Sequence, residues 1–333
     1  MKWNNELPIR KRLLDLRYTC MFKSSRMNYT DRGMNESLDG SAKVEDNHDS
    51  IESAVVIICV LNAPLMLISI AENLLVLTAI KRTPSICSSS MTMLSSLAFS
   101  DLLVGFVAQP FFLASLLTRV TLIERLSKIT AFCLCGVSFC TMTAISIDRF
   151  LALEYPMRYQ STIAAKPRAL ANLVVIIWIM NFVFSGFYVW NWPVYFIMAA
   201  TGVSVFILVS TFCYIRIYRI VRRHQTQIQA QQQAAQQNTT DGDNSNMVRM
   251  KRSALNTFIF YIAMILCYFP IIISLCIASI TFKNVPEVWH LADTVVFLNS
   301  SINPLLYCWR LGEIRAAVFK TLRQMLRRQA DQH

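Results

Sequence analysis

The stretch 148–159 decides the fold class of this chain, and it reads DRFLALEYPMRY. It closes an apolar segment, 125–152, that is long enough to cross a bilayer, since a span needs about 20 mostly apolar residues. An Asp and an Arg side by side at the end of such a segment are costly, because insertion scales put either residue at about 2.5–3.5 kcal/mol at a helix centre. Residues kept at this cost point to function, so Asp148 and Arg149 are the first candidate site residues.

The composition independently indicates a membrane protein. The chain has 333 residues, of which 54% are hydrophobic and only 16% are charged, whereas a soluble domain usually carries about 25% charged residues. The formal net charge of +12 would suit a nucleic-acid partner. The basic residues, however, cluster in short loops between apolar segments and in the C-terminal tail, as is typical of membrane proteins. We therefore expect no nucleic-acid partner, and membrane lipids around the chain.

Seven apolar segments predict an all-α, integral membrane bundle of seven transmembrane helices over residues 53–308. The expected spans are 53–80, 88–116, 125–152, 169–190, 193–218, 254–280 and 288–308. Lys and Arg are concentrated in the loops and tail on one side of this bundle, and the positive-inside rule makes that side cytosolic. The N-terminus is then extracellular.

The regions outside the spans divide into three parts. Residues 1–52 are polar and mixed in charge and predict a disordered extracellular tail, in which Asn28 and Asn35 begin glycosylation acceptor patterns. Residues 224–246 are Gln-rich and predict a disordered cytosolic loop. In 309–333, apolar residues recur at helical spacing among basic ones, which predicts a short amphipathic helix on the membrane surface followed by a cytosolic tail.

Further marks occur in a fixed order along the spans. LAFSD at 97–101 lies in the second segment, CYFP at 267–270 in the sixth, and NPLLY at 303–307 ends the seventh. The remaining marks are the single residues Asn73, Trp178, Tyr214 and Asn299. Together with the stretch 148–159, they resemble the rhodopsin-like (class A) G-protein-coupled receptors over about 53–326.

Within that class the chain is most similar to the melanocortin, adenosine, cannabinoid and lysophospholipid receptor group. ENLLV at 72–76 and the very short link around 191–193 resemble the melanocortin receptors in particular. Glu124 stands where most relatives keep a cysteine, so the usual outer disulfide is not expected. Only Cys20 and Cys276 are then placed to face the outside.

The resemblance implies a ligand-activated receptor at the plasma membrane rather than an enzyme. A ligand shifts the population between two helix arrangements, and the active one promotes nucleotide exchange on a heterotrimeric G protein, with arrestin as a further partner. The residues to which this family assigns coupling and switching are Asp148, Arg149, Pro156, Met157, Tyr214, Tyr268, Pro270, Asn303, Pro304 and Tyr307.

The resemblance also implies a polar network at the centre of the bundle. Its expected members are Asn73, Asp101, Ser138, Asn299 and Asn303. A buried carboxylate must be protonated, paired or ion-bound, and several oxygens around Asp101 suit a small hard cation. We expect sodium on Asp101 and Ser138, the alternative being a neutral Asp101 hydrogen-bonded to Asn73 and water.

The outer cavity departs from the known ligand classes of the family. Ala131 replaces the aspartate of amine receptors, and Phe297 replaces the retinal-binding lysine of opsins. The ligand class, whether small molecule, lipid or peptide, therefore stays open. The residues expected to face this cavity are Gln109, Lys128, Phe132, Ile271, Leu275, His290, Asp293 and Thr294.

Other function classes are less well supported by the residues. A multi-pass transporter or channel is the main alternative, but transporters usually show internal repeats, and the sequence has none. A non-retinal opsin relative is a weaker alternative. No His, Cys or carboxylate cluster has metal-ligand spacing, and no nucleophile motif is present.

Overall fold

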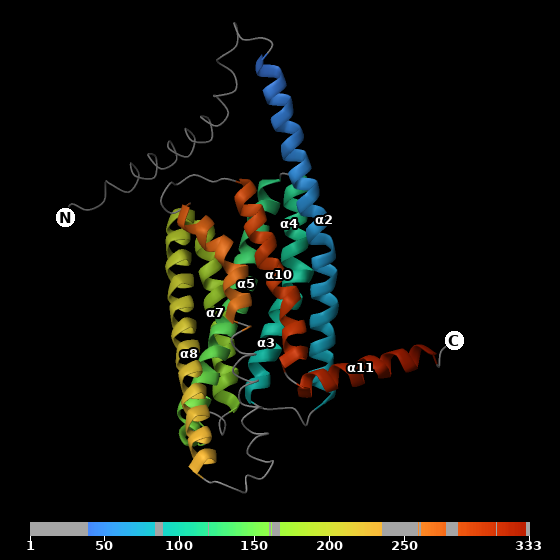
Figure 1. Cartoon of the computed structure of the whole chain (residues 1–333). Coiled ribbons are helices and arrows are strands. Elements are labelled where there is room, and N and C mark those ends of the chain that lie inside the picture. Colours follow the sequence, from blue (N-terminus) through green and yellow to red (C-terminus); the bar gives the residue numbers. More distant parts are fainter. Residues whose placement is uncertain are drawn as a thin grey trace, which may run out of the picture. The chain divides into compact units, whose positions relative to one another are not determined.

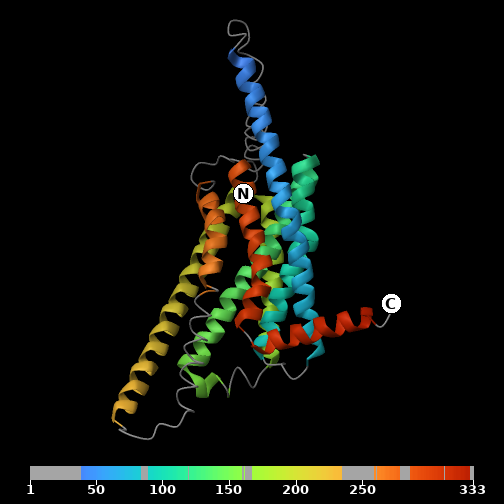
Figure 2. The same ribbon diagram turned by 45° about the vertical axis from the view of Figure 1, so that its right-hand side comes forward.

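The structure is a computed structural model that describes most of the membrane-spanning part of the chain. The described residues are 39–83, 89–118, 120–159, 161, 167–234, 259, 261–277, 286–310 and 312–330. Within them every regular element is helical and no strand occurs. The chain divides into two units, Met1–Val55 and Val56–His333. The second unit holds the helix bundle, and Figures 1 and 2 show its helices running side by side.

The first helix begins earlier than the predicted span. Helix α2 runs from Asp39 to Arg82, so residues 39–52 of the expected disordered tail are helical. Hydropathy locates only the apolar part of a helix.

The second span contains a short stretch of wider helix. It is made of α3 (Ser89–Leu103), the π-helix η2 (Val104–Ala108) and α4 (Gln109–Thr118). Pro110 lies just beyond η2. A proline inside a helix donates no N–H and collides with the carbonyl one turn earlier, and π-bulges are one way a helix accommodates such a residue.

Gly105 in η2 allows α2 to approach very closely. A Cβ atom at this position would lie 3.0 Å from Ile70 Cγ1 and 3.2 Å from the carbonyl oxygen of Met66. The first of these is a side-chain atom, but the second belongs to the backbone of α2 and cannot move alone. The first two spans are therefore packed backbone to backbone at this point.

Helix α5 (Thr121–Glu154) is the centre of the bundle. In the most apolar 18-residue stretch of α5, 61% of the residues are buried. The corresponding stretches of α7 (Pro167–Trp190) and α8 (Trp192–Ala234) have only 11% and 22% of their residues buried. The outward faces of α7 and α8 are apolar and exposed, as expected for helices that contact lipid. The short helix α6 (Pro156–Arg158) follows α5 directly.

The link between α7 and α8 is a single residue, Asn191. Its N–H donates to the carbonyl of Phe187 at 2.9 Å, and its own carbonyl accepts from the N–H of Tyr195 at 2.9 Å. Asn191 Oδ1 also accepts from the N–H of Val194 at 3.3 Å, which caps the first turn of α8. The expected short link is thus confirmed. α8 continues to Ala234 through Gln and Ala, which are good helix formers, so the first part of the predicted loop 224–246 is helical.

The last helices complete the bundle. Five helices are long and apolar enough to cross a membrane by composition, and the described part of the sixth, Tyr261–Ile277, is a shorter apolar helix. α10 (Pro286–Arg310) is the seventh; it carries many polar residues on buried positions, which lowers its mean hydropathy. α11 (Gly312–Ala330) follows and runs across the end of the bundle in both views. We call that end, where α5 places Arg149, the Arg149 end, and the opposite one the Asn191 end.

Candidate functional site

A buried carboxylate lies at the centre of the bundle. Asp101 in α3 is fully buried. Its Oδ1 accepts hydrogen bonds from Ser138 Oγ at 2.8 Å and Ser300 Oγ at 2.9 Å, and its Oδ2 accepts one from Asn303 Nδ2 at 2.8 Å. Three donors from α5 and α10 therefore stabilise one carboxylate and tie these two helices to α3.

The other predicted members of this network point elsewhere. Asn73 in α2 donates to the carbonyl oxygens of Ser69 at 2.9 Å and Ser300 at 3.1 Å, so it ties α2 to α10 without touching the carboxylate. Asn299 Nδ2 lies 3.7 Å from Met142 Sδ. Two expected neighbours of Asp101, Ser138 and Asn303, are thus in contact with it, and Asn73 and Asn299 serve other helix contacts.

Sequence reasoning missed Ser300 and Ser100. Ser300 bonds the carboxylate directly, and Ser100 Oγ lies 2.9 Å from Ser138 Oγ. Each of these serines is next in sequence to a residue that was singled out, Asn299 or Asp101. The only available signal was helical spacing, because Ser300 and Asn303 are three positions apart and share a face of α10.

At the Arg149 end, Asp148 holds two partners close together. Arg149 Nε lies 3.8 Å from Asp148 Oδ2. The hydroxyl of Tyr159, just beyond α6, donates to Asp148 Oδ1 at 2.7 Å. Asp148 is buried, whereas the side chain of Arg149 is 36% exposed. The arginine is thus restrained by its neighbour but still reachable from this end of the bundle.

Tyr214 connects three helices near the same end. Its hydroxyl lies 2.8 Å from Ser146 Oγ of α5. Its ring packs on that of Tyr261, with 4.5 Å between centroids. The hydroxyl of Tyr261 is in turn hydrogen-bonded to Thr211 of α8. The helix Tyr261–Ile277 is therefore fastened to α8 at this end. Tyr307 of α10, another predicted switch residue, is buried.

Three further predicted switch positions are Met157, Pro156 and Pro304. Met157 in α6 is 81% exposed, so it presents an apolar side chain at the Arg149 end. Pro156 begins α6, where the missing N–H of a proline leaves no helical bond unmade. Pro304 lies inside α10.

One ion pair at the Arg149 end was not predicted. Arg216 of α8 donates to Glu154 Oε1 of α5 at 2.8 Å, with side-chain exposures of 41% and 21%. The pair joins the last residue of α5 to the middle part of α8. Charges on separate segments carry no sequence signal that they meet.

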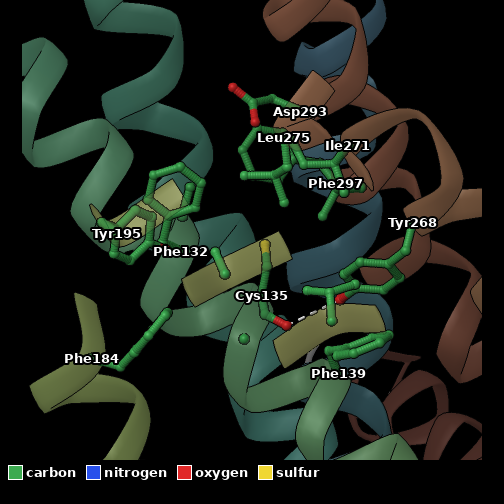
Figure 3. Close-up of a pocket in the computed structure, with 15 residues that line it drawn as sticks. Phe132, Cys135, Phe139, Phe184, Tyr195, Tyr268, Ile271, Leu275, Asp293 and Phe297 are labelled. Carbon is green, nitrogen blue, oxygen red and sulfur yellow. Dashed lines mark hydrogen bonds between the residues drawn. The ribbon is translucent and has the colours of Figure 1, made fainter. Parts of the chain in front are cut away.

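Deeper in the bundle, Tyr268 joins the sixth helix to α5. Its hydroxyl donates to the carbonyl oxygen of Cys135 at 3.0 Å, and its ring lies 4.6 Å from that of Phe139 (Figure 3). Pro270 follows within the same helix, and its carbonyl accepts from Ser274 Oγ at 3.0 Å. A tyrosine here can make the bond to Cys135 because its hydroxyl projects beyond the ring.

A cavity opens above Tyr268 and is lined by α5, α7, α8, Tyr261–Ile277 and α10. Its empty volume is about 630 Å³, part of which is open to solvent. Four of the predicted cavity residues line it: Phe132, Ile271, Leu275 and Asp293. Figure 3 shows Asp293 at one end of the cavity and Phe139 at the other. The lining is largely aromatic and aliphatic.

Lys128 contacts the cavity's acidic residue from α5. Its Nζ lies 2.7 Å from Asp293 Oδ2, and the same Nζ is 5.4 Å from the centroid of the Trp289 ring. The side chains of Lys128 and Asp293 are 16% and 9% exposed. Both residues were predicted to face the cavity, but their pairing was not.

Three other predicted cavity residues lie elsewhere: Thr294 and His290 contact α2 and α4, and Gln109 is buried. Thr294 Oγ1 accepts a hydrogen bond from Asn62 Nδ2 of α2 at 2.8 Å. The ring of His290 lies 5.8 Å from that of Phe112. Gln109 is fully buried, and both its amide atoms make no hydrogen bond with the described residues. None of these three is among the residues that line the cavity.

The eight described cysteines, Cys276 among them, are free thiols. Cys20 and the predicted glycosylation positions Asn28 and Asn35 lie outside the described residues. Where the structure describes the chain, no three His, Cys, Asp or Glu side chains are grouped as a metal site.

Comparison with known proteins agrees with this geometry. Residues 72–190 and 187–307 match the family described as 7 transmembrane receptor (rhodopsin family). Sphingosine 1-phosphate receptor 2 of Homo sapiens is 27% identical over 276 residues, which cover 76% of this chain and 72% of that receptor. This relative is in the lysophospholipid group, whereas the melanocortin likeness of the first span stays a prediction. A helical membrane bundle with a polar centre and a matched span of this extent leads to one conclusion: the chain belongs to the rhodopsin family of seven-transmembrane receptors.

Proposed function

We propose that the chain is a ligand-activated receptor that promotes nucleotide exchange on a heterotrimeric G protein. The observation that supports this most is the arrangement at the Arg149 end, where Asp148 restrains an arginine that remains partly exposed. In this proposal the Arg149 end faces the cytosol and the N-terminus is extracellular. The family is one of receptors, which removes the transporter, channel and enzyme alternatives.

The switch itself is a change in the position of the helix Tyr261–Ile277. In the described arrangement this helix is fastened to α8 by Tyr261 and to α5 by the hydroxyl of Tyr268. A ligand that binds better when these contacts are released shifts the population toward the released state, by no more than its difference in affinity. The opened end then exposes Arg149 and Tyr214, beside the already exposed Met157, to the G protein and, in a later step, to arrestin.

Sodium at the centre of the bundle is part of this proposal. The donor set fits a small hard cation, because a carboxylate and two hydroxyls already converge at Asp101, Ser138 and Ser300. The amide oxygens Asn303 Oδ1 and Asn73 Oδ1 are buried and accept no hydrogen bond from the described residues. When bound, the ion would neutralise the carboxylate and hold α3, α5 and α10 together.

The ligand in this proposal is an amphiphile that enters the cavity tail first. The cavity lining is apolar over most of its length, and the relative is named for sphingosine 1-phosphate. Tyr268 lines the inner part of the cavity and also makes the contact that fastens the sixth helix to α5. An acyl or alkyl chain in this space is therefore in a position to disturb that contact.

The test is the variant Arg149→Ala in reconstituted membranes. We expect it to abolish nucleotide exchange on added G protein while leaving surface expression unchanged, because the fixed charge that meets the G protein is lost. Arg82→Ala, which removes an exposed cation from the end of α2 on the same side, is the matched control and should exchange normally. Normal exchange by Arg149→Ala would overturn the proposal.

A further inference from the structure

The cavity has one charged lining residue among those described, and that residue is already paired. Asp293 lines the cavity at the end nearer the Asn191 end. Lys128 Nζ lies 2.7 Å from Asp293 Oδ2 and also lies over the ring of Trp289, 5.4 Å from its centroid. Both charged side chains are mostly buried, at 16% and 9% exposure. One end of an apolar cavity thus carries two adjacent opposite charges.

A buried ion pair of this kind is weak evidence for a role in stability. Two charges removed from water lose hydration that their attraction hardly exceeds, and an apolar pair of similar volume would hold α5 and α10 together as well. Removing one partner, by contrast, leaves an uncompensated charge in a poorly hydrated place. Any ligand head that separates Lys128 from Asp293 must therefore satisfy both of them.

We propose that the Lys128–Asp293 pair selects an amphiphile whose head carries an anion and a cation side by side. Its anion pairs with Lys128 and its cation with Asp293, so that one ion pair is exchanged for two and no charge is left alone. A purely anionic head would leave Asp293 unpaired, and a purely cationic head would leave Lys128 unpaired. This inference rests on the amphiphile-binding part of the proposed function and names its ligand class.

The cavity also sets where the rest of the ligand goes. Beyond Asp293, its walls are formed by Phe132, Leu275, Ile271 and Phe297, and its far end by Phe139 and Tyr268 (Figure 3). These side chains offer contact area but no further charge. An apolar chain that filled this space would end next to the hydrogen bond between the Tyr268 hydroxyl and the carbonyl of Cys135. Head recognition and the switch are thus at opposite ends of one ligand.

Binding to the full chain in non-ionic maltoside micelles tests the head preference directly. Radiolabelled octadecyl phosphoethanolamine is the probe, and octadecyl phosphate, octadecylammonium and octadecanol compete with it. Because the four share one chain, differences in affinity report the head. We expect the probe's own head to bind at least tenfold more tightly than each of the others. A higher affinity for octadecyl phosphate or for octadecanol, or no difference among the heads, would overturn the proposal.

Two variants, each of which neutralises one charge of the pair, distinguish ligand recognition from an ion pair that only holds α5 and α10 together. The Asp293→Asn variant should bind octadecyl phosphate most tightly, with an affinity about tenfold higher than for the zwitterionic probe. The Lys128→Gln variant should bind octadecylammonium most tightly, by a similar factor. A structural tie predicts instead that both variants weaken all four ligands equally. Glu154→Gln is the matched control, since it breaks an interhelical ion pair of similar length, 2.8 Å, away from the cavity, and it should leave the order of affinities unchanged.

The outcome is separable from that of the proposed function. Nucleotide exchange on added G protein is measured on the same preparations. The expected order of affinities without any stimulated exchange would support the head preference and refute the coupling. Exchange stimulated equally by octadecanol would support the coupling and refute the head preference. The ranking on the unaltered chain requires no variant, so it decides the matter even if a neutralised variant fails to fold.

Discussion

The hydroxyl of Tyr268 allows the most specific test of the proposed switch, because a single substitution removes one hydrogen bond between the sixth helix and α5. Tyr268→Phe removes one oxygen that donates to the carbonyl of Cys135 at 3.0 Å and keeps the ring that packs on Phe139 at 4.6 Å. The side chain is 5% exposed, so the change takes place inside the bundle. Cys135 lies within α5, where its carbonyl also accepts the helical N–H bond, so the substitution leaves no buried acceptor without a partner.

The expected magnitude follows from that geometry. A neutral hydrogen bond contributes about 0.5–1.5 kcal/mol net, and the absence of an orphaned acceptor places this one near the middle, at about 1 kcal/mol. Because a tenfold change in an equilibrium corresponds to about 1.4 kcal/mol, the released arrangement should gain roughly fivefold in population. The bond fastens the sixth helix in the described arrangement, so basal signalling should rise rather than fall.

The assay is basal guanine-nucleotide exchange on purified G protein, with receptor amounts matched by surface labelling. Tyr218→Phe is the control, because Tyr218 is 60% exposed on α8 and the same oxygen is removed there without loss of a buried contact. It should exchange like the unaltered chain. Basal exchange by Tyr268→Phe equal to that of the unaltered chain would show that this bond is the same in both arrangements, and the reasoning would be wrong.

Two further predictions concern the interior. Asp101→Asn should abolish any difference in melting temperature between sodium and potassium chloride at equal ionic strength, because the carboxylate that would hold the ion is gone; a retained difference would place sodium elsewhere. Gly105→Ala should lower the free energy of unfolding by roughly 1–3 kcal/mol, as overpacking does, since its Cβ would meet Ile70 Cγ1 at 3.0 Å. Gly202→Ala, where a Cβ meets nothing within 4 Å, is the control in the same thermal melts and should be neutral or stabilising.

Apolar spans were predictable because the lipid environment imposes a strong and simple rule on composition. That rule fixes where a helix crosses the membrane and says nothing about where it ends. The polar extensions from Asp39 and to Ala234 were therefore missed, since helix propensity continues where hydropathy stops. The seventh span was predicted as an apolar segment, 288–308, that ends in NPLLY at 303–307, and many of its polar residues lie on buried positions of α10.

Contacts between helices were only partly predictable. Asn303 and Ser138 were expected beside Asp101 through the family resemblance, and they are there. The same resemblance named Asn299 where the structure has Ser300, its neighbour. Adjacent residues on a helix face about 100° apart, so only one of the two can face Asp101, and a single sequence does not define which face of α10 is turned toward α3.

Asn191 couples the movements of α7 and α8, because it is the single residue between them. The backbone hydrogen bonds of this residue continue from the last turn of α7 into the first turn of α8, so the two helix ends stay close together. α8 has 43 residues, which makes it roughly 65 Å long at about 1.5 Å per residue, so a tilt of about 5° at Asn191 moves its far end by about 6 Å. A displacement at the cavity too small to change its lining can therefore become a movement of about 3 Å at Arg216, which lies roughly 37 Å along α8 from Asn191 and pairs with Glu154 of α5. Because Asn191 joins the two helices, α7 moves with α8 in part, and the lipid around both helices resists the movement.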